Sequence, residues 1–155
     1  MKNITVNGKE YTLEYSFAAA EHKETVQKIF NIVSGAYIIK QAQKAEENVA
    51  NAMLDGTGEM IADIPNIVKT SFYSGLLENH NVTEDEAYAI MKDYMKENKI
   101  SFKKLFDDIK ECMEDDGFFD LSGLTEMLEE MNKTIEETPK KKTPQDHKKK
   151  STGTK

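Results

Sequence analysis

Residues 4–17 read ITVNGKEYTLEYSF, and the order of residue types in this stretch decides the fold. As far as Tyr15, apolar and polar side chains alternate with period two, which is typical of a strand with one buried face. Asn7-Gly8 tolerates the positive φ angles of a tight hairpin turn, so we predict a β-hairpin over residues 1–15. An isolated hairpin is marginal in water, and one face should therefore pack on the rest of the chain. That face should carry Tyr11, Leu13 and Tyr15.

From Ser16 onward the apolar residues recur with the helical period of 3.6. Ser16 is a good N-cap for a first helix that reaches Val33. Its apolar stripe consists of Phe17, Ala20, Val26, Ile29, Phe30 and Val33. A second helix should end at the sequence DGTG of residues 55–58. Its apolar residues have the four–three spacing of a short coiled-coil seam, which favours self-association. They are Ile38, Ala42, Ala45, Val49 and Ala52.

Helix signals continue to Glu137. A third helix should begin near Glu59, with Pro65 in its first turn or at a kink. Thr83 and Glu86 have the spacing of a capping box, in which each side chain satisfies a free backbone N–H group of the other residue. Ser101 should cap a further helix. After an interruption at Asp116-Gly117, a last helix should run from about Ser122 to Glu137.

These patterns predict a mainly α protein with a short N-terminal β-hairpin. The hairpin, residues 1–15, should pack on a compact bundle of about five to six helices within residues 16–138. Residues 139–155 are rich in lysine and hold no apolar side chain to bury, so we predict a disordered basic tail there.

Charge is distributed unevenly along the chain. All 21 basic residues are lysines, and seven of them lie in the tail against one acid, Asp146. The rest of the chain holds 14 lysines and 27 acids. A body so acidic should repel a phosphate backbone, which argues against nucleic-acid binding. No apolar run reaches the roughly 20 residues of a membrane span, and one cysteine suits a reducing compartment, so we expect a cytoplasmic protein.

Candidates for catalysis or metal binding do not form a recognisable pattern. His22, His80 and His147 have no second histidine or cysteine at ligand spacing, and we interpret each as an exposed polar residue. The acids near Cys112 would raise its thiol pKa, which argues against a reactive nucleophile. We therefore interpret Cys112 as a small core residue. The acidic stretches after Asp55 and Asp116 fail the spacing of a calcium loop. We therefore predict no catalytic residue, no metal site and no cofactor.

An interaction surface is the remaining functional candidate. Residues 111–137 hold ten acids and one lysine, interleaved with large apolar side chains. Methionine adapts to varied partners, so an acidic helix with such a face suits another helix as partner. The same residues would also serve to complete the core, which periodicity alone favours. The candidate partner-binding residues are Phe118, Phe119, Leu121, Leu124, Met127, Leu128 and Met131.

The order of features resembles the small tail assembly chaperones of long-tailed phages and prophages of low-GC Gram-positive bacteria. Three stretches carry the resemblance beside the hairpin: Ile64-Pro65, residues 71–77 (SFYSGLL) and residues 83–87 (TEDEA). The resemblance implies a cytoplasmic, non-catalytic protein that is absent from the mature virion. Its implied partner is the tape measure protein, a long helical client that it keeps soluble, with tail-tube subunits as a further partner.

Two other functions are compatible with the same sequence. One is an acidic phage- or plasmid-encoded regulator that binds a host protein. In this chain, however, the acids are interleaved with apolar stripe residues instead of forming a phosphate-like row. The other is a minor structural component of the tail.

Overall fold

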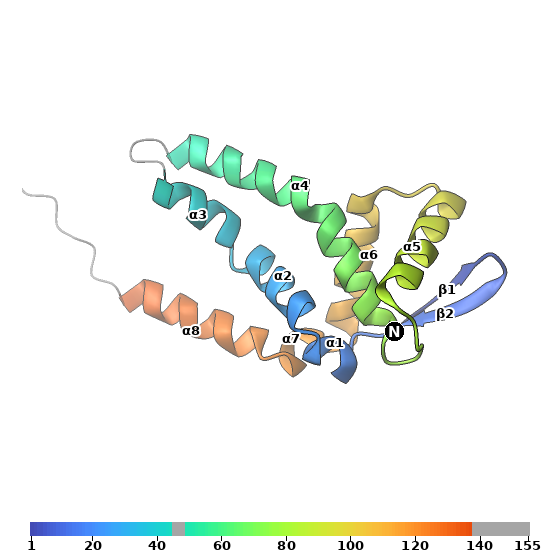
Figure 1. Cartoon of the computed structure of the whole chain (residues 1–155). Coiled ribbons are helices and arrows are strands. Elements are labelled where there is room, and N and C mark those ends of the chain that lie inside the picture. Colours follow the sequence, from blue (N-terminus) through green and yellow to red (C-terminus); the bar gives the residue numbers. More distant parts are fainter. Residues whose placement is uncertain (45–48, 138–155) are drawn as a thin grey trace, which may run out of the picture.

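The computed structural model describes residues 1–44 and 49–137, and it confirms a mainly helical fold with an N-terminal hairpin (Figure 1). Side chains are described except at residues 42–49 and beyond 134. The elements are β1 (Lys2–Val6), β2 (Lys9–Leu13), α1 (Phe17–Glu21), α2 (Lys23–Val33), α3 (Ala36–Lys44), α4 (Val49–Leu76), α5 (Glu84–Asn98), α6 (Phe102–Asp115), α7 (Phe118–Leu121) and α8 (Leu124–Glu137). The predicted tail, residues 139–155, lies outside the described residues.

The hairpin has the predicted turn. β1 and β2 pair antiparallel, and Asn7 and Gly8 both have positive φ angles, 50° and 75°. Leu13 and Tyr15 are buried as expected, whereas Tyr11 is only half-buried. The inner face contacts α4 and α5, so helices supply the support that an isolated hairpin lacks.

The first predicted helix is divided in two. His22 has an extended backbone, with ψ at 93°, and it separates α1 from α2. Its Nδ1 atom accepts a hydrogen bond from the Thr25 N–H group, 3.3 Å away, and thereby caps α2. Ser16 precedes α1 but makes no side-chain capping bond, and Phe17 is 67% exposed. The predicted inward position of Phe17 was wrong, because the chain turns at His22 instead of continuing one stripe.

The predicted helix end at residues 55–58 was also wrong. α4 runs through both glycines of that segment and through Pro65. Gly56 is buried against α3, where a Cβ atom would lie 2.7 Å from the Ile38 Cα atom. The glycine therefore allows two helix backbones to approach closely, and that packing outweighs its poor helix propensity.

The predicted seam of residues 38–52 is partly used inside this α3–α4 pair, since Ile38 faces Gly56 and Ala52 is buried. Its other members, Ala42, Ala45 and Val49, have no described side chains.

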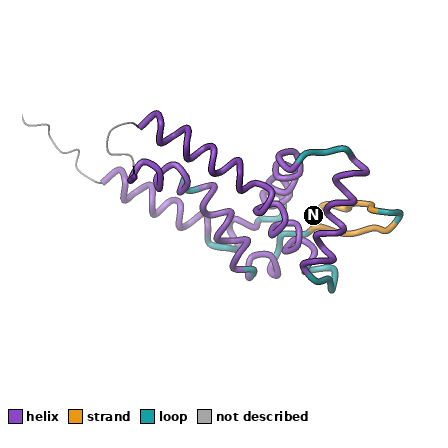
Figure 2. Tube along the Cα trace, turned by 45° about the horizontal axis from the view of Figure 1, so that its top comes forward, coloured by secondary structure: helices purple, strands orange, loops and turns teal. Residues whose placement is uncertain are grey.

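The core surrounds the C-terminal half of α4. Ile67, Val68, Phe72 and Leu76 are fully buried there, and α2, α5, α6 and β2 pack around this half. The N-terminal half of α4 extends away from the hairpin end of the molecule together with α3. α8 extends in the same direction, and both views show these helices reaching beyond the core (Figures 1 and 2).

Local signals at the later helix ends are confirmed. Thr83 and Glu86 form the capping box at the start of α5, and the Ser101 side chain accepts a hydrogen bond from Lys104 N–H at the start of α6. Gly117 and Gly123 each have φ at 74°, and they separate α6, α7 and α8.

Candidate binding surface

Two of the seven candidate partner-binding residues belong to the core. Phe118 in α7 and Leu124 at the start of α8 are at most 1% exposed. Phe118 meets the buried ring of Tyr15 edge-on, with centroids 6.4 Å apart. These two side chains attach the α7–α8 segment to the body and are closed to a partner.

The other five candidates lie at or near the surface. Leu121 is 45% exposed and Met127 is 48% exposed, while Phe119, Leu128 and Met131 are half-buried. Such an exposed methionine on an amphipathic helix is available to a partner and adapts its shape to one. The structure therefore divides the group into buried anchors and an accessible face.

α8 is flanked by an open groove on each side. The groove toward α1 and α2 has a volume of about 460 Å³. It is lined by Ala20, Lys23, Val26, Gln27, Phe30, Leu124 and Met127. The groove toward α6 and the end of α2 has a volume of about 410 Å³. It is lined by Val33, Lys110, Glu114, Phe119, Thr125, Leu128, Glu129 and Asn132.

These grooves reflect a helix that is attached mainly at one end. Among the described elements, α8 approaches α7 most closely, and Figure 1 shows its other end far from the core. α8 carries exposed acids at Glu126, Glu129 and Glu130, and Glu129 is one of the residues that line the second groove. The site thus combines a mainly apolar first groove and a more polar second groove with exposed acids on α8, while Lys23 and Lys110 lie on the facing helices.

The residues of α2 that line the first groove were predicted to be core residues. Val26 and Phe30 were part of the predicted inward stripe, and both are half-buried at the groove. Their periodicity identified the correct face of α2. It contained no signal that α8 would leave part of this face uncovered, because that depends on how the two helices are placed.

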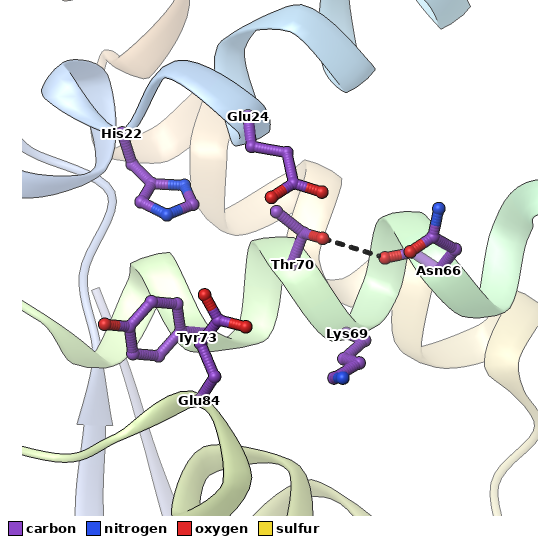
Figure 3. Close-up of a pocket in the computed structure, with 7 residues that line it drawn as sticks. All are labelled: His22, Glu24, Asn66, Lys69, Thr70, Tyr73 and Glu84. Carbon is purple, nitrogen blue, oxygen red and sulfur yellow. Dashed lines mark hydrogen bonds between the residues drawn. The ribbon is translucent and has the colours of Figure 1, made fainter.

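Apart from the two grooves, a polar pocket of about 70 Å³ lies between α2, α4 and the start of α5 (Figure 3). It is lined by His22, Glu24, Asn66, Lys69, Thr70, Tyr73 and Glu84. The Thr70 hydroxyl donates to the Asn66 carbonyl oxygen, 3.1 Å away, within the helix. The volume suits a few water molecules. Within the described residues, no three His, Cys, Asp or Glu side chains converge in a way that could hold a metal ion.

The two described histidines are not simply exposed polar residues, so that prediction was wrong for both. His22 caps α2 and meets the Tyr73 ring edge-on at 5.6 Å. His80 accepts a hydrogen bond from the Thr12 N–H group through Nε2, at 2.8 Å. Both have structural partners far along the chain, which spacing in sequence does not reveal. The third, His147, lies outside the described residues.

Cys112 is buried, as expected for a core residue. Burial raises its thiol pKa to about 11, and the charge of Asp116 adds to the effect. At neutral pH the side chain is therefore a thiol, and its Sγ lies 3.8 Å from the Leu13 carbonyl oxygen. The predicted effect of neighbouring acids is present but is second to burial.

None of the described helices is both long and apolar enough to cross a membrane. Comparison with protein-family models, curated proteins and solved structures gives no match to this chain.

Proposed function

We propose that this protein is a non-catalytic binding protein for a helical client, with α8 and its two grooves as the binding surface. The observation that carries the proposal is the solvent exposure of the Met127 side chain. This methionine is 48% exposed, although it lies beside a groove with apolar walls. A side chain from a client helix would bury that apolar surface, which is the main source of binding free energy for such a contact.

The charge of the surface favours an amphipathic client with basic residues beside its apolar face. Glu126, Glu129 and Glu130 are exposed on α8. Opposite charges at the edge of an interface increase the association rate and exclude acidic competitors. A long helical client would bind several copies of this protein along its length, each through one such surface.

The resemblance to tail assembly chaperones supplies the particular client. We propose that the protein binds the tape measure protein in the bacterial cytoplasm, keeps it soluble and promotes assembly of the tail tube around it. If so, co-expression with a tape measure encoded beside it should yield a soluble complex. A tape measure that neither binds nor becomes more soluble would contradict the chaperone proposal.

The binding surface can be tested by Met127→Glu. The added charge should weaken client binding at least tenfold, since it places a carboxylate opposite an apolar contact. Met53→Glu is the matched control, because Met53 on α4 is similarly exposed at 52%. Titration calorimetry with the client would measure both variants. Equal binding by the two variants would remove α8 from the site.

Both alternative functions make different predictions. A minor structural component should be found by mass spectrometry in purified phage particles, whereas a chaperone should be absent. A host-directed regulator should bind a host protein in preference to a tape measure. On α8 the acids alternate with apolar residues, and this arrangement favours a helical client over an acidic decoy.

A further inference from the structure

The N-terminal half of α4 has an exposed apolar stripe on the side away from α3. Leu54 is 72% exposed and Ile61 is 58% exposed, and Gly58 and Pro65 are exposed between and after them. The four positions follow the spacing i, i+4, i+7 and i+11, so they share one face of the helix. We call these four residues the outer stripe of α4.

The outer stripe is nearly free of charge. Residues 53–66 hold three acids, Asp55, Glu59 and Asp63. Two of them face α3: Glu59 accepts a hydrogen bond from Gln41, and Asp63 accepts one from the Tyr37 hydroxyl, 2.6 Å away. Only Asp55 remains near the stripe in that segment. Such a face is unusual on a chain with 32% charged residues and a net charge of −7.

No contact among the described residues requires glycine at position 58. A Cβ atom there would meet no other atom within 4 Å, in contrast to Gly56, where it would clash with α3. Glycine inside a helix is unfavourable relative to alanine, so its presence suggests a close approach to the helix backbone. The described residues supply no such neighbour, so Gly58 is open to a close approach by a second copy of the chain.

We infer that the outer stripe of α4 is the contact surface of a homodimer, in which two copies of α4 pair antiparallel across Gly58. A twofold axis at Gly58 would place Leu54 of each copy within about 1.5 Å, along the axis, of the partner's Ile61. The two Asp55 carboxylates would be about 9 Å apart along the axis, which avoids direct repulsion. Two copies with the same net negative charge repel each other least across a face without carboxylates, whereas a basic client would prefer the exposed acids of α8.

This inference is independent of the proposed client, and one set of variants separates them. Sedimentation equilibrium of the wild-type chain at about 100 μM should give twice the mass of one chain, which is 17.6 kDa. Leu54→Glu should give a single-chain mass, because it places two carboxylates in an apolar contact. Gly58→Leu should do the same by blocking close approach, while its side chain meets open space within one copy. Met127→Glu is the control and should remain dimeric.

Circular dichroism should show that Leu54→Glu and Gly58→Leu keep the helical content of the wild type, since both positions are exposed. A monomeric wild type would overturn the inference. So would a Leu54→Glu variant that remains dimeric, because the interface would then lie elsewhere. If Leu54→Glu instead abolishes client binding by a monomeric protein, the stripe binds the client and not a second copy.

Discussion

At the scale of single residues, two glycines two positions apart have opposite surroundings. Gly56 is enclosed by α3, where a Cβ atom would lie 2.9 Å from the Tyr37 carbonyl oxygen, whereas Gly58 faces open space. In sequence both belong to DGTG, which is typical of a turn. The close approach of Ile38 to Gly56 explains why the helix continues through this segment. The contact is tertiary, and no local pattern in the sequence predicts it.

The two glycines give a matched prediction for the stability of the fold. Gly56→Ala should lower the free energy of unfolding by about 1–3 kcal/mol, because α3 must shift to admit the methyl group. Gly58→Ala should raise it by about 0.5–1 kcal/mol through better helix propensity and lower entropy of the unfolded chain. Urea unfolding at low protein concentration, where single chains dominate, would measure both. Equal changes would contradict the α3–α4 contact.

At the scale of elements, the break between α1 and α2 depends on one side chain. His22 accepts a hydrogen bond from Thr25 N–H, and its ring packs edge-on against Tyr73. The periodic residues on either side fit one continuous stripe, so their pattern contains no sign of this break. Histidine is not among the preferred N-caps, which is why the cap was not predicted.

The cap at His22 can be separated from the ring contact by two substitutions. His22→Ala removes both, whereas His22→Asn retains a side-chain acceptor and is a favourable N-cap. We expect His22→Ala to be less stable than His22→Asn by about 1 kcal/mol. Thermal and urea unfolding would measure the difference. If the two variants are equally stable, the hydrogen bond from Thr25 N–H contributes nothing measurable to the stability of the fold.

α7 and α8 show what hydrophobic periodicity can predict and what it cannot. The pattern from Leu124 to Met131 identified one apolar face of the last predicted helix, and the structure confirms that helix as α8, whereas the short helix α7 was not predicted. Which members are buried depends on the neighbours they meet. Phe118 lies against Tyr15 from the hairpin end, whereas Met127 has an open groove beside it. The sequence therefore predicted which residues form the candidate surface, but not which of them are buried and which line a groove.

At the scale of the whole molecule, Asp116 connects three distant parts of the chain. Its carboxylate accepts a hydrogen bond from Tyr15 N–H at 2.9 Å and forms an ion pair with the Met1 ammonium group, and it lies at the end of α6. Burial alone would raise its pKa, but these partners outweigh burial and hold the pKa below its usual value. Asp116 therefore stabilises the fold in its charged form.

The low pKa of Asp116 predicts acid sensitivity. A carboxyl group whose folded-state pKa is depressed contributes stability above its unfolded pKa of about 3.9, and that contribution is lost as the pH falls through the folded-state pKa. Asp116→Asn should lower the unfolding free energy at pH 7 by about 1–3 kcal/mol. It should also reduce the loss of stability below about pH 4.

Urea titrations between pH 7 and pH 2 would test this prediction. Asp115→Asn, at an exposed neighbouring position, is the control for the change in net charge. The same acid profile in Asp116→Asn and in the wild type would contradict the proposed contribution of Asp116.

The sequence by itself determined the features that arise from neighbouring residues. The Asn7-Gly8 turn follows from backbone φ preferences, and the starts of α5 and α6 follow from caps at Thr83 and Ser101. These rules act over a few residues and need no knowledge of the rest of the chain.

The tertiary structure alone decided the continuity of α4 through Gly56, the division at His22, and the exposure of Met127 beside the buried Leu124. Each of these depends on packing between segments distant in sequence, where a close approach or an uncovered groove changes which conformation has the lower free energy. Helix propensities of residues other than proline differ by about 1 kcal/mol per residue or less, and tertiary contacts of this kind are large enough to override them.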